Sequence, residues 1–545
     1  MPENTNKFEF LSKERAKLVE KKQNFHNLFE ELGRLEGSHL NSFTGSPSVG
    51  EKKNLNIFDS TYSQSSRRYA SIVESFLTPR TEKYHFFKFQ SEERNKNTNL
   101  RKYADAKNNY HFNKRYDPQA NFASQFHESL LSFAAFGTGV LYVGKRFDKE
   151  TKVQIPIYKS VHISQVYIDE NYNGVVDRVL REFPMKLSEI AEEFGKDKLP
   201  AELVREMEKD PNAVKLVSHR VAPNNEFEKG MFGVKGMKYS STYFIADKRI
   251  ILRDDEGFNS FPYLVIRDLT APNEVWGRGP GINTLPDIKM LNKMVKSLLM
   301  ATDHSVSPTM LAMQDGVASR PNLAPNSIVR GGIDEQGRPT LQPLNRGGDI
   351  SFGLEMINQT RRIVQDAFFV TLFQILQDTP RRTATEVLEL SREKGALLSP
   401  TLGRVQSEAL GRLIEREMDI FKDNPDYPET PEELKDEKFK IVFDSPFDRA
   451  QRAEEVTAIL RTYESILPIA EQNPEVLDNI NDDKAVKSIM LNGGAPADIT
   501  NNEQEIRRIR EARNQSQQAQ AQAEQQQSAS ETVKNLAQAD NLRNS

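Results

Sequence analysis

The spacing of apolar residues changes repeatedly along the first half of the chain, from helical to strand-like and back. Apolar residues at helical spacing predict helices at 11–35, 60–77, 186–194 and 201–209. The polar stretch at 38–56 is expected to form a loop. Runs rich in β-branched and aromatic residues predict strands at 140–143, 154–158, 166–169, 175–183, 243–252 and 263–267. This mixture predicts an α+β body.

Two helix-patterned segments then flank an insert with no periodicity. Residues 281–301 place Leu285, Ile288 and Leu291 on one side of a helix, and residues 350–371 repeat the helical pattern. The insert, 306–348, contains five prolines and two Gly-Gly pairs, which predict turns and short strands. We therefore expect an insert that projects from a helical hairpin.

The longest predicted helix covers residues 383–421. Thr383 and Glu386 form a capping-box pattern at its start, whereas Gly395 and Pro400 predict a bend or break. Its length exceeds what a compact domain usually needs.

The C-terminal residues contain a strand pattern, a helical stretch and a biased tail. Residues 439–443 alternate as a strand does, and 449–480 return to helical spacing, with breaks expected at Pro468 and Pro474. From Asn514 the chain is rich in Gln and Ala, which predicts a tail that is disordered or becomes helical on assembly.

Composition narrows the class of protein. The 545 residues predict about two to four packed regions. The 74 Lys and Arg nearly balance 78 Asp and Glu, and the net charge of −4 argues against a simple electrostatic clamp on nucleic acid. The absence of cysteine excludes disulfides and thiolate metal sites. No signal peptide and no run of ~20 apolar residues is visible, so we expect no membrane partner.

Two apparent ligand motifs fail at a key position. Residues 139–145 fit the start of a phosphate-binding loop, but Arg146 stands where Ser or Thr would hold magnesium, and the apolar run favours a strand. Residues 169–174 begin like a calcium loop, yet Leu180 stands where a bidentate Glu is required, so a hairpin turn is favoured.

No other pattern supports catalysis. The acidic pairs Asp254-Asp255 and Asp482-Asp483 are better explained as solvated turn or helix-start residues than as a metal site. The eight His are scattered, with no pair at metal-ligand spacing. We therefore expect no catalytic residue, cofactor or metal.

Two groups of cationic residues have an open interpretation. Lys289, Lys293 and Lys296 share one face of the first helix of the hairpin, and either face a polyanion or are simply solvated. Arg381 and Arg382 follow Pro380 between two helices, as a capping turn or as a cationic loop tip.

Four segments carry a resemblance to a known family. They are Phe136-Gly-Thr-Gly-Val-Leu-Tyr142, Trp276-Gly-Arg-Gly-Pro-Gly281, Arg382-Thr-Ala-Thr-Glu-Val387 and Ser445-Pro-Phe-Asp-Arg-Ala-Gln-Arg452. Each is weak alone, but their order and spacing are together specific. The chain resembles the podovirus portal proteins of the bacteriophage head-to-tail connector family, from the early helices to about Arg510.

The resemblance implies a helix-rich α+β subunit of a twelve-membered ring around a DNA channel. It implies a wing or body (1–278), first stem helix (279–305), clip (306–348), second stem helix (349–372), channel loop (373–382), long helix and return strand of the wing (383–444), helical crown (445–510) and Gln/Ala-rich tail (511–545). The function implied is a ring at one capsid vertex through which genomic DNA is packaged and ejected.

The resemblance also implies sites and partners. Candidates for facing DNA in the channel are Arg381, Arg382, Lys289, Lys293 and Lys296. Candidates for docking the terminase large subunit, and later the tail adaptor protein, are Arg320, Arg330, Asp334, Glu335 and Arg338 of the clip. Capsid and scaffolding proteins are further implied partners. The portal would be assembled in the host cytoplasm and reside in the virion.

Two other classes of function stay open on the sequence alone. One is a helical adaptor or scaffold protein of the virion without a pore, for which a small oligomer with no channel would be the sign. The other is a nucleotide- or metal-dependent DNA-processing enzyme, which nucleotide binding by the purified protein would favour.

Overall fold

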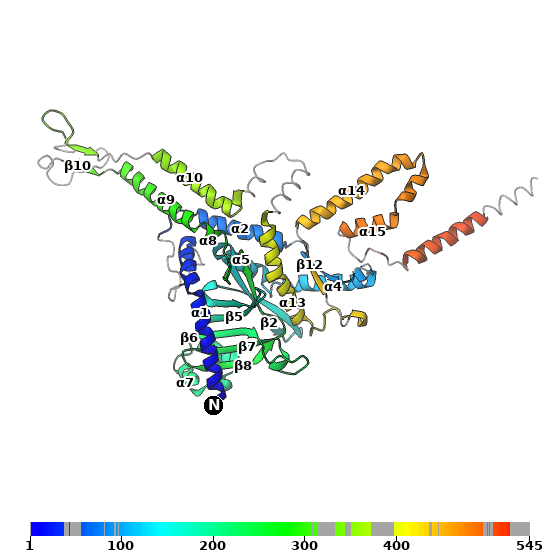
Figure 1. Cartoon of the computed structure of the whole chain (residues 1–545), viewed down its shortest axis with the longest axis horizontal. Helices are drawn as coiled ribbons and strands as arrows, with labels where there is room; N and C mark the ends of the chain where they lie inside the picture. The colour runs from blue at the N-terminus through cyan, green and yellow to red at the C-terminus, as the bar shows by residue number, and fades with distance from the viewer. Residues whose placement is uncertain are drawn as a thin grey trace, which may run out of the picture. The chain divides into compact units, whose positions relative to one another are not determined.

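The computed structural model (Figure 1) describes residues 2–37, 43, 56–80, 82–91, 94–95, 97–307, 309–312, 333–343, 350–371, 397–434, 439–444, 446–493, 499, 501 and 505–523. The chain forms two compact units. The first joins residues 1–80 to 114–425, and the second joins 81–113 to 426–545. Each unit is considered by itself.

The first unit contains a five-stranded antiparallel sheet. Its strands, in spatial order, are β4 (Val166–Glu170), β5 (Val176–Lys186), β6 (Val214–Pro223), β7 (Tyr239–Ile245) and β8 (Ile250–Phe258). Helix α1 (Pro2–Glu36) crosses one face (Figure 1), where Leu11 and Leu18 pack on Leu180 and Phe244. Helices α6 (Leu187–Phe194) and α7 (Ala201–Lys209) cover the other face.

A smaller sheet lies at the centre of the same unit. Its spatial order is β3 (Val153–Val161), β2 (Thr138–Asp148) and β9 (Tyr263–Arg267), all antiparallel. Helix α5 (Phe122–Phe136) packs on β2 and β3, and α2 (Thr61–Leu77) packs on α5. Short 3-10 helices also lie in the connections of this unit: η1 (Ile163–Gln165) between β3 and β4, η2 (Lys196–Lys198) between α6 and α7, and η3 (Val234–Gly236) between β6 and β7.

The predicted helical hairpin is present. After the single turn α8 (Pro280–Asn283), α9 (Leu285–Val306) lies beside α10 (Ile350–Ala367), as Figure 1 shows. Between them, β10 (Met310–Ala312) pairs with β11 (Leu341–Pro343) in an antiparallel ladder. The described part of the insert thus contains the short strands that its prolines and glycines predict.

The structure describes the long helix from residue 397 onward. Its predicted start at Thr383 lies outside the described residues. It runs as an α-helix over 397–405, widens to a π-helix at η4 (Gln406–Leu410) and continues as α13 (Gly411–Phe421). The bend or break predicted from Gly395 and Pro400 is not tested, because Pro400 lies in the first described turn and the residues before 397 lie outside the described part. Within the described part, the irregularity begins six residues after Pro400.

The second unit combines a two-stranded sheet with helices. Strand β1 (His85–Phe89) pairs antiparallel with β12 (Phe439–Phe443), the strand predicted at those residues. The helices are α4 (Thr98–Arg115, whose last two residues belong to the first unit), η5 (Glu432–Leu434), α14 (Pro446–Ala470), η6 (Pro474–Asn479), α15 (Asp482–Asn492) and a helix at 505–523. The break predicted at Pro474 is confirmed, but Pro468 lies inside α14.

Two further predictions need correction. The single strand predicted at 243–252 is two strands, β7 and β8, because the polar residues between them form a turn in which the Arg249 amide donates to the Ala246 carbonyl and Arg249 has φ 55°. Helix α5 was not predicted, because most of its circumference is buried and its apolar residues therefore show no one-sided period.

Candidate stem root, channel and docking surfaces

The two glycine-rich segments that carry the family resemblance meet in the fold. Gly137 ends α5 with φ 75°, and its backbone lies directly against that of Gly277 and Gly279. A Cβ built on Gly279 would lie 2.7 Å from the Gly137 Cα, and one built on Gly277 would lie 2.2 Å from the Gly137 oxygen. Only glycine permits so close a crossing of two backbones.

Hydrogen bonds hold this crossing together. The Gly277 amide donates to Thr138 Oγ1 at 2.9 Å, and the Asp268 amide donates to the Gly137 carbonyl at 3.0 Å. Next to it, a Cβ on Gly281 would lie 2.3 Å from the Ala135 oxygen. The crossing therefore fixes α8, which leads into α9, against the end of α5. We call it the stem root.

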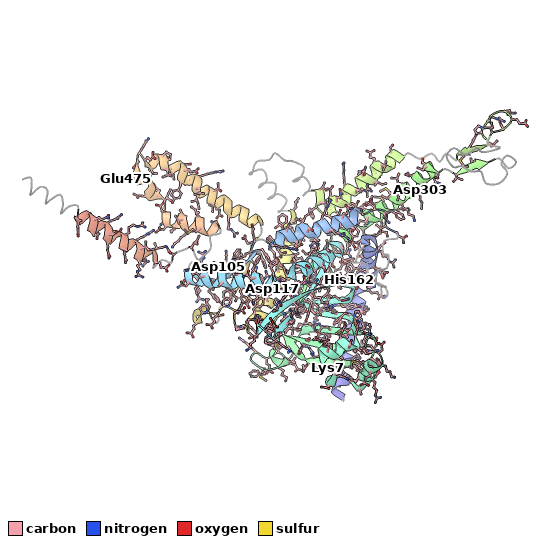
Figure 2. All side chains as sticks on the ribbon, turned by 180° about the vertical axis from the view of Figure 1, so that it is seen from behind. Lys7, Asp105, Asp117, His162, Asp303 and Glu475 are labelled. Atoms are coloured by element: carbon pink, nitrogen blue, oxygen red, sulfur yellow. The ribbon has the colours of Figure 1, made fainter. Side chains whose placement is uncertain are left out.

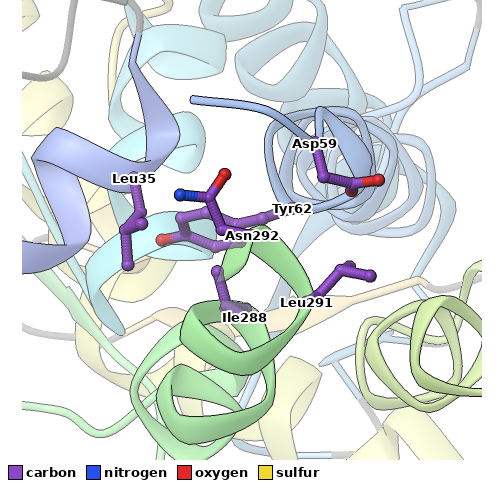
Figure 3. Close-up of a pocket in the computed structure, with 6 residues that line it drawn as sticks. All are labelled: Leu35, Asp59, Tyr62, Ile288, Leu291 and Asn292. Carbon is purple, nitrogen blue, oxygen red and sulfur yellow. The ribbon is translucent and has the colours of Figure 1, made fainter. Parts of the chain in front are cut away.

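A second set of contacts clamps the hairpin onto the segment before α2. Arg361 of α10 donates through Nε and Nη2 to Asp59 at 2.9 and 2.7 Å. Asn292 of α9 accepts from the Phe58 amide at 2.7 Å and donates to the Asn56 carbonyl at 3.0 Å. Figure 3 shows Asp59 and Asn292 beside the small pocket that they line with Leu35, Tyr62, Ile288 and Leu291.

The three candidate lysines of α9 share an exposed face, as their spacing predicts. Lys289 forms an ion pair with Glu31 of α1 at 2.6 Å, and Lys296 Nζ lies 5.3 Å from the centre of the Phe58 ring. Lys293 is exposed, and no ion pair joins it to another described residue. Two of the three therefore have partners within the subunit, and their role toward DNA stays a prediction.

Helices α9 and α10 expose apolar side chains along their length. Those of α9 include Met290, Leu299 and Met300, and those of α10 include Leu354 and Ile363; Met300 is 52% exposed. Asp303, labelled in Figure 2, marks the outer end of α9. A hairpin with apolar residues on its outer surface is typical of an element that packs against another subunit.

The clip candidates are described only in part. Asp334 accepts from Arg338 Nε at 2.8 Å and from the backbone amides of Gln336 and Arg338, and the Arg338 amide is the main reason that the pKa of Asp334 is lowered. Glu335 is exposed in the same turn. Arg320, Arg330 and the predicted channel loop with Arg381 and Arg382 lie outside the described residues.

The long helix is attached to the body by buried charges that the sequence analysis missed. Arg115 and Glu417 form a two-pronged ion pair with distances of 2.7 and 2.6 Å, both side chains are fully buried, and Tyr158 donates to Glu417 at 2.6 Å. Arg416 Nε donates to the Val143 carbonyl at 3.2 Å. The sequence signal is a Glu in the apolar stripe of a helix, but its partner is 302 residues away.

Arg267, at the end of β9, is a second buried charge that was missed. Its guanidinium is 1% exposed and contacts Glu408 of the π-helical segment through Nε and Nη2, both at 2.9 Å, and Glu170 at 2.7 Å. Burial opposes its charge, yet hydrogen bonds to Glu408 and Glu170 raise the pKa of Arg267 overall. It also donates to the carbonyls of Val275 and Gly174.

The motifs judged unsuitable for ligand binding have structural roles. Residues 139–145 lie in strand β2 and pair with β3 and β9. The calcium-like segment is a hairpin turn in which Asn171 Oδ1 accepts from the amides of Asn173 and Val175, and Gly174 has φ 74°. Both predictions are confirmed.

The acidic pairs take part in surface ion pairs. Asp254 pairs with Lys7, which Figure 2 labels near the start of α1, at 2.8 Å, and Asp483 pairs with Arg510 at 2.5 Å. Among the described residues there is no cluster of three His, Cys, Asp or Glu arranged to bind a metal ion. Nor does that part of the chain contain a helix with the length and apolar character needed to cross a membrane.

Known proteins resemble this chain over most of its length. The portal protein of Salmonella phage epsilon15 is 26% identical over 428 residues, which are 76% of this chain and 75% of that protein. A probable portal protein of Bordetella phage BPP-1 is 25% identical over 431 residues, 77% of this chain and 76% of that one.

Solved structures of gene transfer agent necks align more loosely. The neck of an empty particle computed with C6 symmetry has a TM-score of 0.39 and 12% identity, covering 78% of this chain and 94% of that one. The neck of a native particle computed with C12 symmetry has a TM-score of 0.34 and 13% identity, covering 78% and 94%.

The decisive comparison is with a protein family. Residues 9–500 match the family described as bacteriophage head to tail connecting protein. This range includes the stem root, the hairpin helices α9 and α10, and the long helix. Because the match covers most of the 545 residues, the chain belongs to the family of bacteriophage head-to-tail connecting proteins, as the sequence resemblance predicts.

Proposed function

We propose that this protein is the portal of a tailed podovirus, a ring at one capsid vertex through which genomic DNA is packaged and ejected. Family membership supports the class of protein. The observation that carries the proposal in the structure is the helical hairpin: α9 is fixed through the stem root and α10 through Arg361 and Asp59, and the hairpin exposes apolar side chains such as Met300 and Leu354. A neighbouring subunit in a ring would cover these side chains.

The charge balance agrees with passage of DNA rather than its capture. A channel that moves DNA must avoid many strong phosphate contacts, since each adds to binding and creates a stop. The net charge of −4 meets this requirement. The few cationic candidates are Arg381, Arg382 and the exposed Lys293, which would contact phosphates as the DNA passes.

The clip is proposed to dock the terminase large subunit during packaging and the tail adaptor afterwards. Its described turn presents Glu335 to solvent, whereas Asp334 and Arg338 bind each other. Capsid and scaffolding proteins are further proposed partners at the vertex, with assembly in the host cytoplasm before the portal becomes part of the virion. The role proposed is structural and involves no catalysis.

The experiment that tests this proposal is native mass measurement with electron microscopy of the purified protein. Twelve copies of the 62.2 kDa chain predict a closed ring of about 750 kDa with a central hole, because head-to-tail contacts must close on themselves. A stable small oligomer without a hole would instead favour the adaptor or scaffold alternative.

The enzyme alternative has less support. The loop on which a nucleotide-dependent activity would depend, residues 139–145, is a paired strand. Binding of ATP by the purified protein, measured by calorimetry, would revive it.

A further inference from the structure

The buried face of the long helix widens at the π-helical segment. Before this segment the buried apolar positions are single ones, at Leu398, Leu402 and Val405. From this segment onward adjacent apolar positions are buried together, namely Ala409-Leu410, Leu413-Ile414 and Ile420-Phe421.

The π turn lies where the buried face widens. The Gly411 amide donates to the Gln406 carbonyl, five residues earlier, which widens the turn and accommodates one extra residue. The widened turn also presents Glu408 to Arg267.

Arg267 connects this turn to the stem root. One edge of its guanidinium holds Glu408, while Nη1 donates at 2.9 Å to the carbonyl of Val275, the residue directly before the segment 276–281. The next residue, Asp268, donates its amide to Gly137 and accepts from Thr401 of the long helix at 3.1 Å. Arg267 and Asp268, at the end of β9, are therefore hydrogen-bonded to the long helix and to both segments that meet at the stem root.

The two sides of the π turn are attached to different parts of the body. On the C-terminal side, Arg416 and Glu417 hold α13 to β2, β3 and Arg115. On the N-terminal side, Thr401 and Arg404 bind Asp268 and Thr270, which follow Arg267 directly. The π turn is thus the point at which the helix changes from one set of anchors to the other.

We propose that Arg267 is a positioning residue that couples the stem root to the long helix, and that the π turn at Gln406–Leu410 is the hinge on which it acts. With the Arg267–Glu408 contact intact, residues 397–405 keep one rotational position relative to α9. When the contact is removed, α13 stays in place and residues 397–405 sample several positions.

Pairs of spin labels can test this coupling in the assembled full-length protein. The chain has no cysteine, so Met290→Cys on α9 and Leu397→Cys, both at exposed positions, give one defined label pair. Mixing labelled chains with an excess of unlabelled ones limits the signal to distances within a subunit. We expect Glu408→Gln to broaden the distance distribution roughly twofold, because several positions become populated.

Three comparisons keep the result interpretable. Gly403→Ala is the control, since nothing lies within 4 Å of the added Cβ, and it should leave the distribution unchanged. Arg267→Lys keeps the charge but loses the two-pronged geometry, and should give an intermediate width. In the unsubstituted protein, hydrogen exchange at residues 406–411 should be roughly tenfold faster than at 412–421.

The proposal is overturned if Glu408→Gln and Arg267→Lys both match the control distribution, or if exchange is uniformly slow across 406–421. These measurements do not require that the protein be a portal. If the ring proposed above is absent while the distributions broaden, the coupling stands and the proposed function fails.

Discussion

Gly137 is subject to two separate constraints at the residue scale. Its φ of 75° lies in the left-handed region, and a Cβ there would lie 2.1 Å from the Gly279 nitrogen. Strain alone costs about 1–2 kcal/mol. The collision adds to this cost, because both neighbours are backbone atoms that cannot rotate away.

We therefore predict that Gly137→Ala prevents folding or lowers stability by more than about 3 kcal/mol. Gly195→Ala is the matched control, since Gly195 has φ 86° and nothing within 4 Å of its Cβ position. It should lose only the strain energy. Urea denaturation compares the two, and equal losses would show that the backbone crossing contributes nothing.

The buried Lys22 side chain should make the stability of the fold depend on pH. It is 2% exposed and donates to the carbonyls of Ile163, Ser164 and Val166, and burial lowers its pKa to about 7. Between pH 7 and its ordinary pKa, the unfolded chain binds the proton more than the folded one does, so stability rises with pH in this window. Below pH 7 the burial cost is fully present.

The Lys22→Met variant removes this titration. Between pH 7 and pH 9 we expect the free energy of unfolding to rise less steeply in the variant, by up to about 1.4 kcal/mol per pH unit. The thermal midpoint, measured at both pH values, should accordingly increase less in the variant. A surface control, Lys21→Met, removes a lysine of the same helix that is 55% exposed and should leave the slope unchanged. Parallel slopes for Lys22→Met and the original protein would contradict the prediction.

At the scale of elements, the fully buried ion pair between Arg115 and Glu417 helps to attach the long helix to the body. Removing either Arg115 or Glu417 leaves the other charge buried, which typically costs about 3–5 kcal/mol. We predict losses of that size for Arg115→Met and for Glu417→Gln in urea denaturation. Because the two share the same contact, the double variant should lose clearly less than the sum. Additive losses would mean that the pair is not coupled.

Periodicity predicted the elements that have one buried face. The stem helices, α6, α7 and β12 match their predicted positions because each has one apolar side and clear ends. Strand β6 and helix α4 were missed: β6 begins with exposed apolar residues and buries Ser218 and His219, and α4 includes the buried polar residues Lys107, Asn108 and His111. Their core contacts come from distant parts of the chain, which local sequence cannot show.

The residues of the candidate site likewise divide into some that the sequence marked and others that it did not. The glycine segments stood out in the sequence because glycine is needed where backbones touch, although nothing local said that they touch each other. Arg267 and Glu408 looked like ordinary charged residues, and only the tertiary structure brings them together over 141 residues. The apolar stripe continues from Val405 to Ala409 and Leu413 in steps of four, so the spacing of apolar residues gave no sign of the π turn.

At the scale of the whole molecule, the segment predicted to be the channel loop supplies a test of the proposed function. We predict that replacing Arg381 and Arg382 by Ala leaves ring assembly intact but alters DNA packaging or retention, because phosphate contacts in the channel are lost. Lys88→Ala, at an exposed position on β1, is a control for loss of positive charge. Unchanged DNA length and retention in virions with the double variant would count against the loop's role.

The ion pair between Arg115 and Glu417 also sets an order of events during synthesis. At about 5–20 residues per second, roughly 15–60 s separate the appearance of these two residues on the ribosome. Through that interval β2 and β3 lack the long helix that packs on them. The body of the nascent chain must therefore remain open and within reach of chaperones until nearly four-fifths of the chain has been translated.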